Sequence, residues 1–228
     1  MHHKLKAGAS RNDRHPFFLP AITKECEPMT SNHLALLGDS IFDNASYVAP
    51  SESVIEHLRR TLKSPHACTL LAVDGDVTRQ VHAQLQRLPP STTHLVLSVG
   101  GNDALSWLPT LDHPVSSVME ALAHLNHIQT DFTSHYDYLM DRVSERRLPT
   151  LVCTIYDAVP GLTPALETAL SVFNDVVTRS AMQHRFDILD LRTLLTEAAD
   201  FSEVSPIEPS GQASQKLARA IADWSVAV

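Results

Sequence analysis

The chain has 228 residues, of which 43% are hydrophobic, and it carries a formal net charge of -8 at pH 7. This length and apolar content suffice to bury one ordinary core, so we expect a single domain. The negative charge argues against nucleic acid or an anionic membrane as the main partner. The N-terminus lacks the apolar region of a secretory signal and no stretch is apolar enough to span a membrane, so we expect a cytoplasmic protein.

Residues 1–31, rich in His, Lys, Arg and Pro, are expected to form a flexible extension, and residues 32–228 a single domain. The three cysteines, Cys26, Cys68 and Cys153, are widely spaced and odd in number, which argues against a disulfide framework. Cys68 and Cys153 lie beside or within apolar runs, where small buried thiols are common. None of the three is a convincing nucleophile.

Apolar runs alternate with segments of helical spacing along the rest of the chain. Parallel strands need crossover connections, and right-handed crossovers cover both faces of a sheet. The alternation therefore predicts an α/β fold with a parallel sheet of about five strands between helices. The expected strands are 34–37, 69–73, 95–99, 150–155 and 186–189, and the expected helices are 53–62, 77–88, one or two within 115–147, 166–182 and 211–224.

A Gly-Asp-Ser tripeptide at 38–40 directly follows the first expected strand. It places the Ser40 hydroxyl at the C-terminal end of a buried strand, where open α/β sheets bind their ligands. The glycine permits a tight turn, and the segment 41–44 can begin a turn or helix whose unpaired N–H groups favour a developing anion. Ser40 is therefore a candidate nucleophile, although a turn in which Asp39 or Ser40 caps a helix gives the same pattern.

Two further strands also end in small or polar residues. The run 69–73 leads into Asp-Gly-Asp at 74–76, and the run 95–99 leads into Gly-Gly-Asn-Asp at 100–103. All of these motifs follow strands, so they are expected at one edge of the sheet. Trp107, just beyond the last motif, is a candidate for the wall of a pocket there, as is Tyr156 after the fourth strand.

The order of these motifs resembles the SGNH (GDSL-type) hydrolases, a family of esterases, lipases, thioesterases and carbohydrate deacetylases. The resemblance covers roughly residues 34–224 and implies a flavodoxin-like, three-layer αβα sandwich. It also implies that Ser40 is the nucleophile, and that the N–H groups of Ser40 and Gly75 and the side-chain amide of Asn102 form an oxyanion hole. Acyl transfer places negative charge on a carbonyl oxygen and needs fixed donors aimed at it, each worth on the order of 3 kcal/mol.

The last loop departs from the family pattern. SGNH hydrolases carry Asp-x-x-His before the final helix, where the histidine is the general base and the aspartate orients it. This chain has Glu208 where the histidine is expected and Ser205 where the aspartate is expected. The flanking sequences at 209–212 and 216–218 resemble the family's loop and last helix. We therefore interpret the change as a substitution in place.

Three hypotheses follow from the substitution. In the first, Glu208 is the base of a modified esterase. In the second, one of the 13 histidines acts as the base instead. In the third, the fold is kept while hydrolysis is weakened or lost. A glutamate has an unperturbed pKa of about 4.3, so it needs burial or nearby negative charge to accept a proton at neutral pH. Asp39, Asp74, Asp76 and Asp103 all lie beside the strand ends, where they can supply that charge.

We therefore expect a serine hydrolase that acts on a small ester, thioester or O-acyl substrate through an acyl-enzyme on Ser40, with Gly75, Asn102 and Glu208 completing the site. No cofactor is needed, and no metal-ligand spacing stands out. The alternative is a weakened or inactive protein of the same fold that binds a small acyl or carboxylate ligand. A phosphate-handling enzyme is a weaker hypothesis, because the chain has no glycine-rich phosphate loop and the expected site is acidic.

Overall fold

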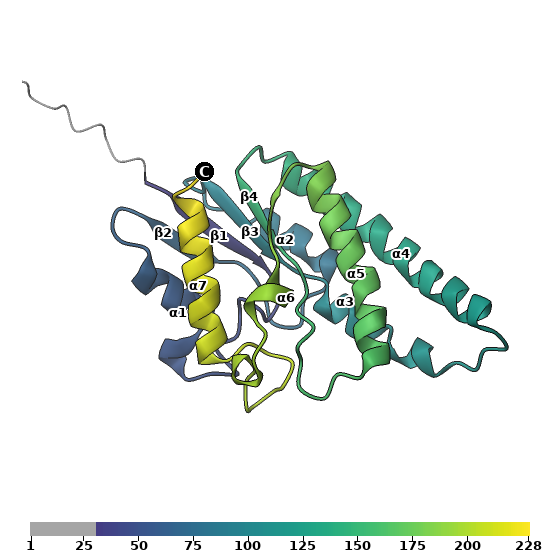
Figure 1. Cartoon of the computed structure of the whole chain (residues 1–228). Coiled ribbons are helices and arrows are strands. Elements are labelled where there is room, and N and C mark those ends of the chain that lie inside the picture. The colour runs from purple at the N-terminus through teal and green to yellow at the C-terminus, as the bar shows by residue number, and fades with distance from the viewer. Residues whose placement is uncertain (1–30) are drawn as a thin grey trace, which may run out of the picture. The chain divides into compact units, whose positions relative to one another are not determined.

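The computed structural model describes residues 31–228, so all but one residue of the expected N-terminal extension lies outside the described residues, as does Cys26. At the centre is a sheet of five strands, all parallel, in the order β2-β1-β3-β4-β5 (Figure 1). The strands are β1 (His33–Gly38), β2 (Ala67–Leu70), β3 (His94–Ser98), β4 (Thr150–Cys153) and β5 (Asp187–Leu189).

Helices cover both faces of the sheet (Figure 1). The first face packs against α1 (Val54–Thr61), α6 (Leu191–Leu194) and α7 (Gly211–Ser225), and the second against α2 (Val81–Leu85), α4 (Val118–Ser144) and α5 (Pro164–Gln183). The remaining elements are α3 (Gly101–Ser106) and the 3-10 helices η1 (Pro50–Glu52), η2 (Thr78–Gln80), η3 (Leu108–Asp112) and η4 (Ala198–Asp200). The predicted three-layer αβα sandwich is confirmed. Among residues 31–228, no helix combines the length and apolar content needed to cross a bilayer.

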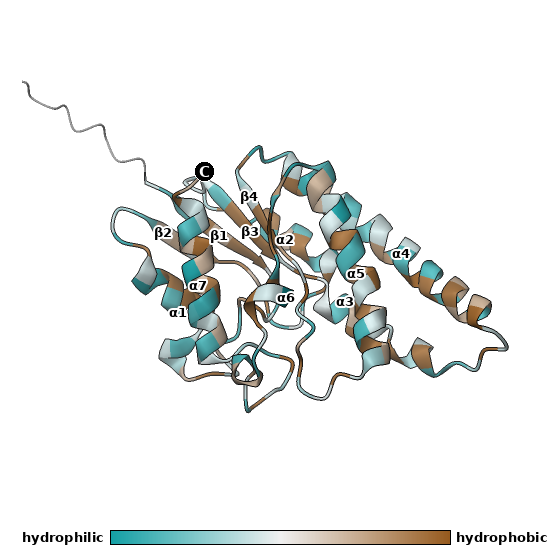
Figure 2. Cartoon of the chain, viewed as in Figure 1, coloured by the Kyte–Doolittle hydropathy of each residue, from teal (hydrophilic) through white to brown (hydrophobic). Residues whose placement is uncertain are grey.

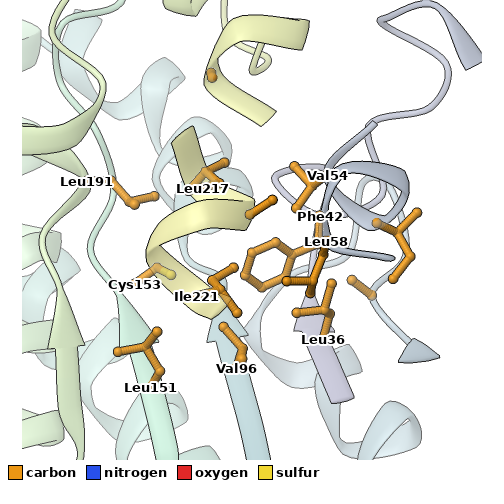
Figure 3. Close-up of a cluster of buried hydrophobic side chains, with 14 of the residues drawn as sticks. Leu36, Phe42, Val54, Leu58, Val96, Leu151, Cys153, Leu191, Leu217 and Ile221 are labelled. Atoms are coloured by element: carbon orange, nitrogen blue, oxygen red, sulfur yellow. The ribbon is translucent and has the colours of Figure 1, made fainter. Parts of the chain in front are cut away.

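The alternation of side chains along β1 explains the two cores. Leu34 and Leu36 belong to the core under α1 and α7, whereas Ala35 and Leu37 belong to the core under α2, α4 and α5. Figure 2 shows the central strands as the most hydrophobic part of the fold, and Figure 3 shows Leu36 together with side chains of α1 and α7. Each fully buried leucine contributes about 1.5–3 kcal/mol relative to an exposed one.

The predicted boundaries differ most from the structure in the second strand and the second helix, and the predicted fourth strand, 150–155, ends at Cys153. The second strand ends at Leu70 instead of continuing to Val73, because the N–H groups of Leu71 and Ala72 both donate to Leu36 O (2.9 Å each) and interrupt the ladder. The predicted helix at 77–88 is η2 followed by the five-residue α2. The long helical pattern within 115–147 forms one helix, α4.

The end of β1 is the tightest point in the sheet. Gly38 has φ +131°, and a Cβ there would lie 1.7 Å from the carbonyl oxygen of Ser98, its partner on β3. Asp39 N donates to the same carbonyl (3.2 Å). Only glycine allows the two backbones to come this close, and Ser40 follows two residues later.

We predict that Gly38→Ala lowers the free energy of unfolding by about 3 kcal/mol or more, because the new methyl group must push β1 away from β3. The control is Gly161→Ala, which also has a positive φ (+83°) but has no atom within 4 Å of the added Cβ. It is expected to cost only about 1 kcal/mol. Chemical denaturation of both variants measures the difference, and equal losses would contradict the close contact.

Candidate active site

The candidate site lies at the C-terminal edge of the sheet, where β1 and β3 end. Ser40 sits in a turn after β1, in which Phe42 N and Asp43 N both donate to Asp39 O (3.2 and 3.1 Å). Asn102 is the second residue of α3, which follows β3 directly. In a sheet of order 2-1-3-4-5, the connection that leaves β1 leads to β2 on one side, and the connection that leaves β3 leads to β4 on the other. Open α/β sheets bind their ligands at such a switch point.

Ser40 and Glu208 are joined by a buried hydrogen bond. The Ser40 hydroxyl donates to Glu208 Oε1 at 3.0 Å, and each residue is only 6% exposed. The pKa of the Glu208 carboxyl is raised to about 7, mainly by burial and to a smaller extent by the charge of Asp74, while the hydrogen bond from Ser40 lowers it. A carboxylate with this pKa is a stronger base than an ordinary glutamate and is largely ionised above neutral pH.

The backbone around Glu208 is fixed on both sides. Glu208 N donates to Ser205 O (3.0 Å), and Glu208 O accepts from Ser202 N (2.8 Å). The hydroxyl of Tyr156, which is buried beside the cavity, donates to the carbonyl of Ile207. These contacts hold the carboxyl group at Ser40 without any contribution from a histidine.

Two buried polar contacts tie the loop 197–210 to the rest of the site. Lys216 Nζ lies 2.8 Å from Oδ1 of Asp200, whose side chain is fully buried, so the start of the loop is attached to α7. Asn44, in the turn after Ser40, is fully buried and donates to Pro209 O (3.2 Å), next to Glu208. Asn44 therefore links the Ser40 turn directly to the Glu208 loop. Sequence reasoning missed it.

The second oxygen of Glu208 has no protein partner. Oε2 is buried and accepts no hydrogen bond within residues 31–228. Ser205, which stands where an orienting aspartate is expected, contributes its carbonyl oxygen to the turn, and no hydrogen bond joins its side chain to the Glu208 carboxyl. The arrangement is therefore a Ser-Glu pair and not a three-membered relay.

The three N–H donors of the predicted oxyanion hole remain available. The backbone N–H groups of Ser40 and Gly75 donate to no acceptor in the described part of the chain. Asn102 Nδ2 uses one of its two protons to bind Asp76 O (3.0 Å), which leaves the other free. Asn102 lines the cavity beside Ser40, whereas Gly75, with φ +81°, is exposed in the loop after β2 and is not part of the cavity wall.

Gln84 connects the strand that carries Ser40 with the loop that carries Gly75. Its side chain accepts from Gly38 N (2.7 Å) and donates to Gly38 O (2.7 Å) and to Asp76 Oδ2 (2.8 Å). Because Asp76 O in turn holds Asn102, one buried amide sets the spacing of all three strand ends. Sequence reasoning missed Gln84, although a polar residue three positions after Val81 on the apolar face of α2 was a usable signal.

The acidic residues beside the strand ends play different roles. Asp39 is buried, burial raises the pKa of its carboxyl to about 8, and Oδ1 accepts from Ile41 N (3.1 Å). Asp103 accepts from both N and Oγ1 of Thr78 (3.0 Å each), so it fixes the start of η2. Of the four aspartates, Asp74 is the one whose charge raises the pKa of Glu208.

A mainly apolar cavity of about 330 Å³ opens beside Ser40. Its lining includes Ser40, Asn102 and Glu208, together with residues of α3, η3, the segment 154–162 and the first halves of α4 and α5. Trp107 and Tyr156 both line it. No histidine, lysine or arginine lies in the wall, so the hypothesis of a relocated histidine base finds no support in residues 31–228.

The cysteines and metal-binding groups offer no competing chemistry in the described residues. Burial raises the pKa of the Cys153 thiol far above its ordinary value and that of Cys68 to about 11, so both are poor nucleophiles. No three His, Cys, Asp or Glu side chains within residues 31–228 gather as a metal site.

Several solved structures of hydrolases and lipases share this fold. The chain superposes on an alpha/beta hydrolase enzyme from the metagenome of Lake Arreo (TM-score 0.65, 16% identity, 86% of this chain and 95% of the other). It also superposes on an extracellular lipase of Streptomyces rimosus (TM-score 0.62, 17% identity, 86% of this chain and 99% of the other). A third match is a lipase/acylhydrolase of Enterococcus faecalis (TM-score 0.62, 19% identity, 85% of this chain and 94% of the other). At these identities the likeness is one of fold.

Among curated proteins, none matches this chain in sequence. The model of the GDSL-like lipase/acylhydrolase family matches residues 36–212, which include Ser40, Gly75, Asn102 and Glu208. This match spans most of the chain and agrees with the motifs at the ends of β1 and β3. The chain therefore belongs to the GDSL-like lipase/acylhydrolase family.

Proposed function

We propose that this protein hydrolyses esters, thioesters or O-acyl groups through an acyl-enzyme on Ser40, with Glu208 as the general base. Membership of the family supports ester hydrolysis in general. The observation that carries the specific proposal is the buried 3.0 Å hydrogen bond from Ser40 Oγ to Glu208 Oε1, in the lining of an apolar cavity. Nucleophile and base within hydrogen-bond reach are the minimum that acyl transfer requires.

In the first step Ser40 Oγ attacks the carbonyl carbon of the substrate while its proton passes to Glu208 Oε1. The carbon–oxygen bond forms as the electron pair of the carbonyl moves to its oxygen. When this intermediate collapses, the bond to the alcohol or thiol breaks and Glu208 returns the proton to the leaving group. A water molecule, activated in the same way, then releases the carboxylic acid and restores Ser40.

The negative oxygen of the intermediate needs hydrogen-bond donors that are already in place. The unused N–H groups of Ser40 and Gly75 and the free amide proton of Asn102 are such donors. Loss of one donor of this type costs about 10²- to 10³-fold in kcat. The apolar cavity wall supports an apolar acyl group as the part of the substrate that lies against α4 and α5.

A second candidate function is binding without turnover. The observation that favours it is the buried Glu208 Oε2, which lacks the orienting partner that bases of this kind usually have. In that case the same cavity would hold an acyl or carboxylate ligand. The two functions differ in whether Ser40 reacts.

We predict that a fluorophosphonate labels Ser40 and that p-nitrophenyl acetate turnover falls to background in Ser40→Ala. Glu208→Gln is expected to lower kcat by about 10²- to 10⁴-fold, because the amide accepts no proton. Glu203→Gln, which changes an exposed carboxylate of the same loop, is the matched control and keeps full activity. Absence of both labelling and turnover in the wild type would favour the binding function. Recovery of turnover in Glu208→His with Ser205→Asp would then identify a lost catalytic pair.

The pH profile tests the identity of the base. Glu208 must be ionised to accept the proton, and burial raises its pKa to about 7, so kcat/KM is expected to rise with pH through a midpoint near 7. The enthalpy of ionisation of a carboxyl group is small, so this midpoint is expected to change little with the temperature of the assay. A midpoint that moves strongly with temperature would identify a histidine instead, and one near 4 would contradict a buried base.

Gln84 is expected to act as a positioning residue. We predict that Gln84→Met lowers kcat by about tenfold or more with little change in KM, because Ser40 and Asn102 lose their fixed spacing. Gln80→Met is the control: Gln80 is exposed and its side chain accepts only from Val77 N. Steady-state kinetics of both variants give the comparison. Unchanged kcat in Gln84→Met would show that the spacing does not depend on this side chain.

A further inference from the structure

Exposed apolar side chains are concentrated next to the cavity. Of the fifteen large apolar residues that are exposed within residues 31–228, seven fall between positions 105 and 122. Val118 and Met119 are 78% and 75% exposed, and Leu122 is 53% exposed. Soluble proteins rarely leave a large contiguous apolar patch without a use. We call this surface the α4 patch; it consists of Leu105, Leu108, Leu111, Val115, Val118, Met119 and Leu122.

The first turns of α4 bury no side chain, and Leu125 is the first apolar residue of the helix that packs against the core. The buried residues of α4 begin at Ile128, ten positions after the helix starts. Figure 1 shows the first turns of α4 and α5 lying well apart, although the two helices pack together further along, and Figure 2 shows hydrophobic residues at this end of α4. An ordered helix end with apolar side chains is therefore exposed to solvent.

The α4 patch continues the wall of the cavity. Leu105, Leu108 and Leu111 are exposed and also line the cavity. On α4, Val118 and Leu122 lie four residues apart on the helix face that next carries Leu125, a cavity residue. Whatever covers the patch therefore lies at the mouth of the cavity that leads to Ser40.

The charges around the patch limit what can cover it. Residues 88–141 contain no lysine or arginine, whereas Asp112 and Glu120 lie within the patch segment. An anionic surface would be repelled, since membrane-surface helices that bind anionic lipids carry basic residues. A protein partner or a second copy seated here would cover the mouth of the cavity and hinder substrate entry. An apolar surface without net charge fits both constraints.

We propose that the α4 patch docks on a lipid surface without net charge, which places the mouth of the cavity against the phase that holds apolar esters. The role of this docking in turnover depends on the proposed function, but the docking itself does not require hydrolysis. Val118, Met119 and Leu122 enter the surface, and the cavity wall from Leu105 to Leu111 forms the path to Ser40.

Sedimentation with phosphatidylcholine vesicles tests the proposal in a Ser40→Ala background, which excludes turnover. The full chain is expected to bind, and Val118→Gln/Met119→Gln/Leu122→Gln is expected to bind at least about tenfold more weakly. Glutamine favours helix, and all three side chains are exposed, so the fold is expected to be retained. The control is Met182→Gln/Val226→Gln/Val228→Gln, which removes three equally exposed apolar side chains outside the patch and keeps wild-type binding.

Added phosphatidylserine is expected not to strengthen binding. Absence of binding to phosphatidylcholine, equal binding by both triple variants, or a dimer that only the α4 triple variant dissociates would overturn the proposal. With Ser40 restored, turnover of dissolved p-nitrophenyl acetate is expected to be the same in the α4 triple variant and the wild type. A wild-type protein that binds vesicles but hydrolyses no ester would refute the proposed function and leave the docking in place.

Discussion

The site depends on one buried hydrogen bond, from Ser40 Oγ to Glu208 Oε1 at 3.0 Å. Its proposed role in catalysis depends on its surroundings, because burial is the main cause that raises the pKa of Glu208 to about 7. In water the same pair would be a hydroxyl beside a weak base. In the function that we propose, the apolar cavity therefore has two roles: it accepts an acyl group, and it makes a glutamate basic enough to replace an imidazole.

Three close contacts set the geometry around that hydrogen bond. Gly38 lets β1 and β3 approach until no side chain fits between them, and Gln84 fixes the loop after β2 against the same point. Asn44 then ties the Ser40 turn to the Glu208 loop. Because each contact involves backbone atoms, a shift at any of them moves Ser40 relative to Glu208 or to the proposed oxyanion donors.

Most of the fold followed from the sequence, because five apolar runs separated by helical patterns admit few topologies other than a covered parallel sheet. The position at which β2 ends could not be predicted, because an edge strand can stop pairing with its neighbour while the run of apolar residues continues. Motif order also brought out Ser40, Asn102 and Glu208, which the structure places in one cavity. Gln84 and Asn44 were missed because their partners are backbone atoms 46 and 165 residues away.

The most direct measurement is a crystal structure of the protein after reaction with an alkyl phosphonate, which mimics the tetrahedral intermediate. We predict phosphorus on Ser40 Oγ, the phosphonyl oxygen within about 3 Å of Ser40 N, Gly75 N and Asn102 Nδ2, and the alkyl chain in the cavity. Glu208 would remain within hydrogen-bond distance of Ser40 Oγ. An adduct whose phosphonyl oxygen faces solvent, or whose oxygen is held by other donors, would contradict the proposed mechanism.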